Sequence, residues 1–209
     1  MEELGIVATT EFYLLGVPVT SSVLSTWIMM AMVIVAVVLL RWKAPVVLEM
    51  LIDFVDGLAA GFIKGPTQPY IPFLGALCLF IAVANLIGIV PVMFTPTRDI
   101  NTPLALALVV LFMTFVFGIY AKGLGGFLKT FFSPMLPLDL IGYFSRTMSL
   151  SLRLFGNILG GEIVVAVLFM LVPVGVPLVM VALGTITGIL QAYVFTVLAS
   201  SYIGSFLES

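Results

Sequence analysis

Four charged side chains stand in one apolar stretch and are the residues best suited to chemistry. Residues 136–172 contain Asp139, Arg146, Arg153 and Glu162. An ionised side chain in the middle of a bilayer costs from about 3 to more than 10 kcal/mol, and an arginine does not lose its proton to avoid that cost. We expect Arg153 to meet a carboxylate on another subunit or to guard an ion path. A structural arginine bonded to backbone carbonyls is the alternative.

Helical geometry divides the polar residues of this stretch between two faces. At about 100° per residue, four of them fall within roughly 40° of one another: Asp139, Arg146, Arg153 and Asn157. Glu162 points to the opposite side. Small residues let another backbone come close to the helix: Ser145, Ser149, Gly156, Gly160 and Gly161. We expect Arg153 and Asn157 to face a partner and Glu162 to face the last helix, as an ion relay. The alternative is a Glu162 that is protonated or reaches the outer water.

The last apolar run has a polar face of its own. Gly184, Gly188 and Gln191 recur at i, i+4 and i+7, which places them on one side of a helix. The two glycines form a small-xxx-small pair suited to close helix packing. Gln191 is expected to lie on the ion pathway, and an interhelical hydrogen bond without a transport role is the alternative.

Composition excludes several classes of protein. The chain has 209 residues, of which 62% are hydrophobic and 9% charged, and its mean hydropathy is +1.31. Soluble domains carry about 25% charged residues, so an ordinary water-soluble fold is excluded. The chain has no histidine and a single cysteine, and we expect no metal site and no cofactor. A formal charge of -2 argues against nucleic acid as a partner.

The uncharged runs predict an all-α membrane protein, with residues 1–209 as a single membrane domain. Residues 1–22 form an external N-terminus, and about five transmembrane helices follow: 23–41, 72–94, 103–121, 136–172 and 178–206. The Gly-rich segment around Gly123 is expected to be a loop. The fourth helix would be about 55 Å long, against a hydrocarbon core of about 30 Å. The last two spans are therefore expected to form a long tilted hairpin.

The pattern of charged and apolar residues over 44–64 predicts one interfacial amphipathic helix. Glu49, Asp53 and Asp56 recur on one side of it, and apolar residues line the other. An acidic face favours a protein partner over anionic lipid. A helix packed on its neighbours with a solvated acidic edge is the alternative.

The positions of the basic residues predict the orientation of the chain. Cytoplasmic loops of membrane proteins are enriched in lysine and arginine. The predicted spans leave only Arg98 outside and put five basic residues in the cytoplasm: Arg41, Lys43, Lys64, Lys122 and Lys129. We therefore expect the N-terminus outside and the C-terminus in the cytoplasm.

Residues 149–157 read SLSLRLFGN and are followed by Gly161 and Glu162. This segment resembles the hallmark segment of subunit a of the F-type ATP synthases. Residues 85–88 with Pro91, residues 97–102 and residues 191–195 resemble other blocks of that family. The resemblance covers the chain from about residue 20 to its end.

The resemblance implies a stator subunit in a bacterial cytoplasmic membrane, or an equivalent energy-transducing membrane. It implies two half-channels that carry H⁺ or Na⁺ to and from the carboxylates of a ring of c subunits, coupling ion flow to rotation and ATP synthesis or hydrolysis. The subunit would be no enzyme on its own, and its partners would be the c-ring, the b subunits of the peripheral stalk and membrane lipid.

The resemblance also implies roles for individual residues. Arg153 would be the essential arginine that faces the ring, and three polar residues would lie near the ion path: Asn157, Glu162 and Gln191. Asp139 would lie toward the cytoplasmic half-channel, with Arg146 nearby. Many relatives place a histidine or glutamate where Gly184 stands, as a partner for Glu162, and this chain lacks that partner.

Two other classes of function remain open from the residues alone. A secondary transporter that works by itself would need a central binding site with compensating acids, often at broken helices in repeated halves. The sequence shows no convincing internal repeat. A structural membrane scaffold is the third class. A stoichiometric ring of carboxylate-bearing subunits that copurifies with the chain would separate the first class from both others.

Overall fold

The computed structural model describes residues 10–14, 17–89, 97, 99–131, 136–171 and 175–208, and most of their side chains. Within these ranges the chain forms a hairpin of two antiparallel strands, β1 (Thr10–Leu14) and β2 (Val17–Thr20), and then six α-helices. The helices are α1 (Ser21–Lys43), α2 (Pro45–Ala60), α3 (Ile71–Leu86), α4 (Asn101–Phe131), α5 (Leu136–Leu171) and α6 (Val176–Glu208), and a short 3-10 helix, η1 (Ile87–Ile89), follows α3. The prediction of an all-α membrane fold is confirmed.

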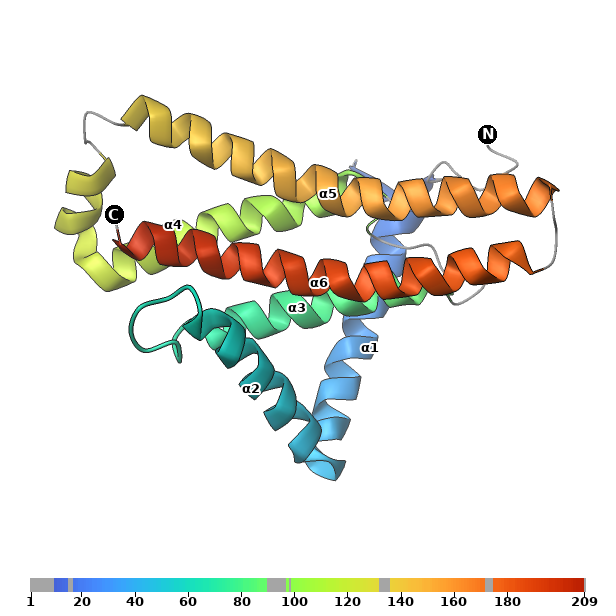
Figure 1. Ribbon diagram of the computed structural model, residues 1–209, viewed down its shortest axis with the longest axis horizontal. Coiled ribbons are helices and arrows are strands. Elements are labelled where there is room, and N and C mark those ends of the chain that lie inside the picture. The colour runs from blue at the N-terminus through green and yellow to red at the C-terminus, as the bar shows by residue number, and fades with distance from the viewer. Residues whose placement is uncertain are drawn as a thin grey trace.

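The helices α3, α4, α5 and α6 lie side by side, and the apolar core lies between them. Figure 1 shows α5 and α6 running antiparallel along the long axis of the molecule, with α3 and α4 beside them. Fully buried side chains from all four helices meet in this core: Leu74, Ile81, Val110, Leu150, Leu154, Phe195 and Ile203. Burial of these apolar groups holds α5 and α6 in a fixed position against α3 and α4.

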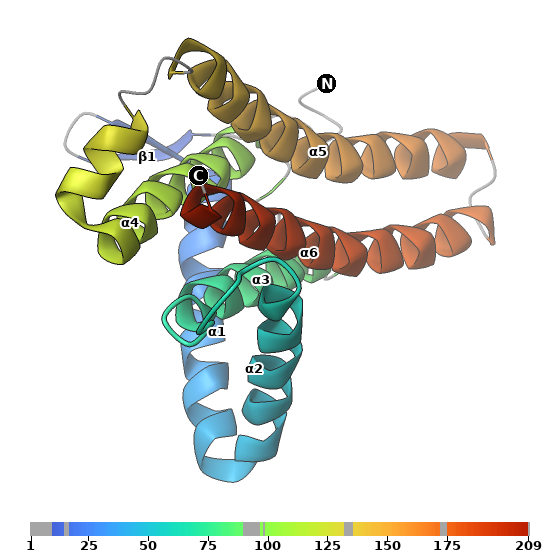
Figure 2. The ribbon, with the colours of Figure 1, turned by 60° about the vertical axis from the view of Figure 1, so that its left-hand side comes forward.

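The helices α1 and α2 form a separate hairpin that projects from the others and crosses α5 and α6 steeply (Figures 1 and 2). Large apolar side chains cover α1 and remain exposed, such as Ile34, Val35 and Leu39. Residues 23–40 of this helix are uncharged, and a run with this surface is suited to lipid. Met29 is its buried contact, packing with Ala84 and Ile87 near the end of α3.

The acidic residues of α2 do not all share one environment. Glu49 and Asp53 are exposed, as the predicted amphipathic pattern requires. Asp56 is partly buried and accepts a hydrogen bond from the hydroxyl of Thr67 in the turn that precedes α3. The opposite side of α2 contributes Val55 and Ala59 to the core. The helix is therefore packed on its neighbours with a solvated acidic edge, and its place at a membrane interface stays a prediction.

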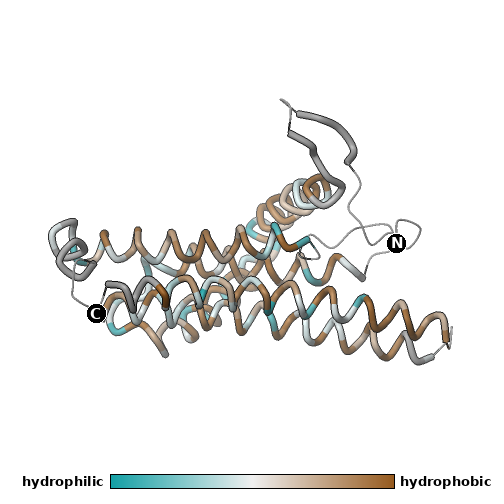
Figure 3. Tube along the Cα trace, turned by 90° about the horizontal axis from the view of Figure 1, so that it is seen from above, coloured by the Kyte–Doolittle hydropathy of each residue, from teal (hydrophilic) through white to brown (hydrophobic). Residues whose placement is uncertain are grey.

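Four segments of the described chain are long and apolar enough to cross a bilayer: Val23–Lys43, Asn101–Gly123, Ile141–Leu171 and Leu178–Leu207. Apolar residues dominate the helices along their length (Figure 3). The helix α3 has 16 residues, about 24 Å at 1.5 Å per residue, which is less than the roughly 30 Å hydrocarbon core. Its crossing of the membrane, and with it the count of five spans, stays a prediction.

The Gly-rich segment after residue 121 differs from the prediction of a loop. The helix α4 continues to Phe131, and a break at Gly123 divides it into two parts. Gly123 has φ 72° and ψ 165°, a conformation that glycine adopts without the steric penalty of a Cβ atom. The chain therefore kinks at this glycine, and a second helical part continues to Phe131.

Candidate functional site

The α5–α6 hairpin aligns the polar residues of its two helices. The guanidinium carbon of Arg146 lies 5.2 Å from the centre of the Tyr202 ring. The helices are antiparallel and rise equally per residue. Moving eleven residues along each helix from this contact therefore brings Asn157 level with Gln191. Two of the predicted site residues thus lie at about the same height along the hairpin.

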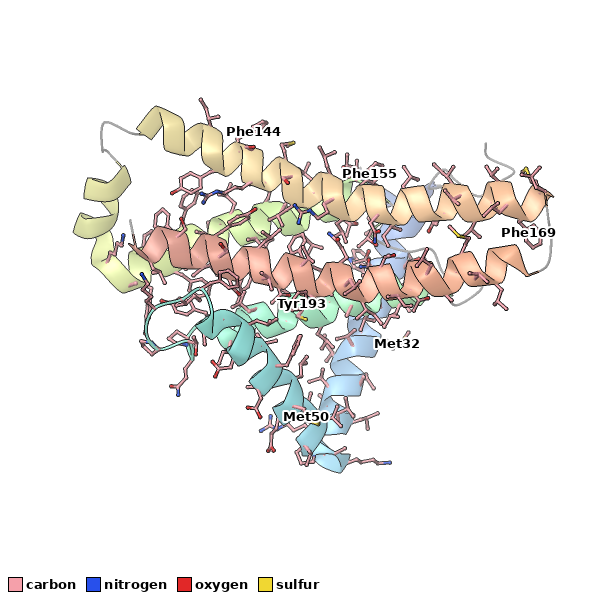
Figure 4. The ribbon with its side chains drawn as sticks, in the orientation of Figure 1. Met32, Met50, Phe144, Phe155, Phe169 and Tyr193 are labelled. Carbon is pink, nitrogen blue, oxygen red and sulfur yellow. The ribbon has the colours of Figure 1, made fainter. Side chains whose placement is uncertain are left out.

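A pocket of about 410 Å³ opens between α5, α6 and the end of α3. Its polar lining comes from Glu162, Asn157, Asn85 and Thr185, and apolar residues make up much of the remainder. Phe169, near the turn that joins α5 to α6, also lines it (Figure 4). A carboxylate and amides in a space of this size form a site that water and a small ion can occupy.

Gly184 lies in the same pocket as Glu162. The predicted direction of Glu162, toward the last helix, agrees with this arrangement. A Cβ atom built on Gly184 would have no other group within 4 Å. The position where the resemblance implies a partner for Glu162 is therefore open space in this chain, and it enlarges the pocket beside the carboxylate.

Two amide groups lie buried at this site without a hydrogen-bond partner. Among the residues that the structure describes, Asn157 Nδ2 and Gln191 Nε2 are the buried side-chain donors left unpaired. The side chain of Gln191 is buried, with an exposed fraction of only 7% for the residue. An unpaired buried donor costs about 1–3 kcal/mol, so such groups in native proteins require an explanation, for instance a bound water or ion.

Asn157 lines the same pocket as Glu162, and its predicted place on the face of Arg153 that meets a partner stays a prediction. Asn157 is only about 40° around the helix from Arg153, but that rotation is toward the side of the buried Leu154. The pocket spans a wide stripe of α5, so both Asn157 and Glu162 reach it. Helical phase alone did not reveal how far the pocket extends around the helix.

Arg153 lies on an exposed flank of α5, near the middle of the helix. The next residue, Leu154, is fully buried in the core, so the helix turns its interior side away from the arginine. Four of the small residues noted in the sequence share the exposure of Arg153: Ser145, Ser149, Gly156 and Gly160. No ion pair to Arg153 occurs within the described part of the chain. Two large side chains, Phe144 and Phe155, lie about 180° to 200° around the helix from it (Figure 4).

Arg146 and Asp139 lie toward the first half of α5. Arg146 is half-buried, and its guanidinium lies over the rings of Tyr143 and Tyr202. Asp139 belongs to the first turn of α5, and its side chain lies outside the described residues. Arg146 therefore faces aromatic rings of this chain, whereas Arg153 is exposed.

Asn85 is a site residue that sequence reasoning undervalued. Its Nδ2 donates to the carbonyl oxygen of Gly188 at 2.9 Å, and its Oδ1 accepts from the hydroxyl of Thr97 at 3.0 Å. A Cβ atom on Gly188 would lie 3.1 Å from the Cβ of Asn85. The predicted groove thus has two parts, since Gly188 packs against α3 while Gly184 lines the pocket. The signal for Asn85 that the sequence offered was an amide side chain in a long uncharged run.

Comparison with known proteins identifies the family of the chain. The family described as "ATP synthase A chain" matches residues 19–204. A protein of Bradyrhizobium sp. named "ATP synthase subunit a 2" is 36% identical, and the alignment covers 100% of this chain and 98% of the relative. A protein of Moorella thermoacetica named "ATP synthase subunit a" is 37% identical, with 94% and 95% covered.

A protein of Picosynechococcus sp., also named "ATP synthase subunit a 2", is 38% identical over 90% of this chain and 86% of its own length. The similarity therefore extends over α1 to α6 and includes both the pocket and the arginine flank. These matches extend over nearly the whole length of the chain. The chain therefore belongs to the ATP synthase A chain family, which provides a membrane subunit of the ATP synthase complex and not a catalytic one.

Proposed function

We propose that this chain is the ion-translocating stator subunit of a rotary ATP synthase. It would provide two half-channels that carry H⁺ or Na⁺ to and from the carboxylates of a c-ring, coupling ion flow to rotation and to ATP synthesis or hydrolysis. The observation that carries the proposal is the separation of two groups on one helix. Arg153 stands on an exposed flank of α5, and Glu162 lines a pocket between α5 and α6.

The exposed flank is suited to a neighbouring helix of the ring. Small residues beside Arg153 let a partner backbone approach closely, and no group lies within 4 Å of a Cβ placed on Gly156 or Gly160. A fixed guanidinium charge there favours the ionised form of a ring carboxylate. It also opposes the direct passage of another cation along this flank.

The pocket supplies the outer half-channel in this proposal. An ion reaches Glu162 through the water-sized space beside Gly184, then passes the buried amides of Asn157 and Gln191. Transfer to a ring carboxylate neutralises it, which permits that ring subunit to rotate into lipid. The membrane potential contributes about 2.3 kcal/mol per charge per 100 mV.

The orientation follows from where the basic residues gather. Lys122 donates to the carbonyl oxygen of Phe206 at 3.0 Å, so it lies at the end of α6. A Cβ atom on Gly204 would collide with the carbonyl oxygen of Phe62, which places the segment before Lys64 at the same end. We assign this end to the cytoplasm. The N-terminus is then outside, in a bacterial cytoplasmic membrane or an equivalent one, and the b subunits of the stalk are the further partners.

The decisive experiment replaces Arg153. Arg153→Ala should abolish ion-driven ATP synthesis while the complex, with its ring, still assembles, because the side chain supports no described contact within the chain. Arg153→Lys should also lose most activity, since a compact ammonium does not reproduce a planar guanidinium. The assay is ATP synthesis by proteoliposomes under an imposed ion gradient. Normal synthesis by Arg153→Ala would overturn the proposal.

A further inference from the structure

Arg146 is held by two aromatic rings from two different helices. Its guanidinium carbon lies 6.0 Å from the centre of the Tyr143 ring on α5 and 5.2 Å from that of the Tyr202 ring on α6. Both distances fall within the range of roughly 6 Å for a cation–π contact. An arginine near a helix end would otherwise extend toward the membrane surface. The two rings keep its charge between α5 and α6.

The surroundings of Arg146 are closely packed. A cavity of only about 10 Å³ adjoins it, lined by Tyr143, Tyr202, Thr114 and Thr147 among others, which leaves room for about one water molecule. The Thr114 hydroxyl donates to Val110 O at 2.8 Å, and the Thr147 hydroxyl donates to Tyr143 O at 2.9 Å. Each hydroxyl therefore keeps its lone pairs for an acceptor role. No ion pair neutralises Arg146 among the side chains that the structure describes.

Arg146 shares one side of α5 with the arginine on the exposed flank. Arg146 and Arg153 are two turns apart along the helix and are separated by only about 20° around it. The titratable groups in described contact with Arg146 are Tyr143 and Tyr202.

We propose that Tyr202, together with Tyr143, is a positioning residue that holds the charge of Arg146 beside the inner part of the ion path. The placed charge lowers the affinity of a ring carboxylate for its ion on the inner side of Arg153, so the ion is released there. This inference rests on the proposed function. It adds a second, internally held cation to the arginine that faces the ring.

The expected effect is a change in the inner concentration of the transported ion that inhibits ATP synthesis. A unit charge about 10 Å from a carboxylate, at an effective dielectric constant of about 20–40, shifts its ion affinity by about four- to seventeenfold. Without the placed charge, the ring carboxylate binds its ion more tightly on the inner side. Synthesis is then inhibited at a lower inner concentration of the transported ion, whether that is H⁺ or Na⁺.

The test uses the assembled complex in proteoliposomes, with ATP synthesis driven by a fixed membrane potential and outer ion concentration. The inner concentration of the ion that halves the rate is measured. It should fall about four- to seventeenfold in Arg146→Gln and in Tyr202→Leu, and it should stay unchanged in Tyr202→Phe, which keeps the ring. Tyr193→Leu is the control, since Tyr193 is a half-exposed tyrosine of α6 that contacts Phe54 at 6.3 Å instead.

The outcomes distinguish the positioning role of Tyr202 and Tyr143 from a merely structural role and from a failure of the proposed function. A merely structural loss would lower the rate without moving the half-inhibitory concentration. The inference is overturned if Tyr202→Leu keeps the wild-type value, if Tyr202→Phe shifts it equally, or if Arg146→Gln leaves it unmoved. Tyr143→Leu, expected to give a smaller shift, decides the matter if Tyr202→Leu fails to assemble. Absence of ion-driven synthesis in the wild type would contradict the proposed function itself.

Discussion

Gly184 and Gly188 lie on one side of α6, one turn apart, and the same substitution should have opposite effects at the two positions. A Cβ atom on Gly188 would lie 3.1 Å from the Cβ of Asn85, whereas one on Gly184 would meet nothing within 4 Å. Gly188 also presents its carbonyl oxygen to Asn85 Nδ2 at 2.9 Å. Gly188→Ala therefore requires the Asn85 side chain or α3 to shift by a few tenths of an ångström, and Gly184→Ala need not move anything.

The magnitudes follow from these contacts. Alanine stabilises a helix interior over glycine by about 0.5–1 kcal/mol, and Gly184→Ala should show only this gain. At Gly188 the gain is opposed by overpacking, about 1–3 kcal/mol, and by weakening of a buried hydrogen bond, about 0.5–1.5 kcal/mol. The net result is a loss of about 0.5–4 kcal/mol. At about 2–4 °C per kcal/mol, the unfolding midpoint should fall by about 1–16 °C in Gly188→Ala and rise by about 1–4 °C in Gly184→Ala.

Cys78 provides the assay, because it is the only cysteine of the chain and it is buried. Its thiol should react with a fluorescent maleimide only when the α3–α6 packing opens. The purified complex is heated in steps, labelled briefly, and the fluorescence of this chain is read after electrophoresis. A Gly188→Ala complex that exposes Cys78 at the same temperature as Gly184→Ala, or at a higher one, would refute the reasoning about the close contact with Asn85.

Two further predictions concern the pocket and the topology. Glu162→Gln keeps the size of the side chain but loses its ionisation, so ion-driven synthesis should slow by at least about tenfold while the ring stays bound. Gln191→Leu should slow synthesis to an intermediate extent, since it loses hydrogen-bonding capacity but no charge. Wild-type rates in both variants would remove the pocket from the ion path. Single cysteines at positions 98 and 126, in a Cys78→Ala background, should react with impermeant reagents from opposite sides of the membrane; reaction of both from one side would contradict the assigned topology.

The amino-acid sequence by itself determined the class of the protein and the approximate positions of its helices. Uncharged runs of sufficient length predict membrane helices because a bilayer core leaves no partner for unpaired backbone groups. The long helix α5 and the opposite directions of Arg153 and Glu162 are local properties of one segment, so spacing alone revealed them. The charge of Arg153 in an apolar run was equally visible, because its cost in a bilayer demands an explanation.

Only the tertiary structure decided which neighbour fills each face, since those contacts join segments far apart in the chain. Asn85 and Gly188 meet across α3 and α6, and nothing in either segment specified the other. Asn157 turned out to line the pocket because α6 and the end of α3 widen that space around α5. The cation–π contact of Arg146 likewise needs Tyr202 from α6. Helical phase gives the direction of a side chain from its own axis, and the packing of other helices decides whether that direction leads to lipid, to a pocket or to another ring.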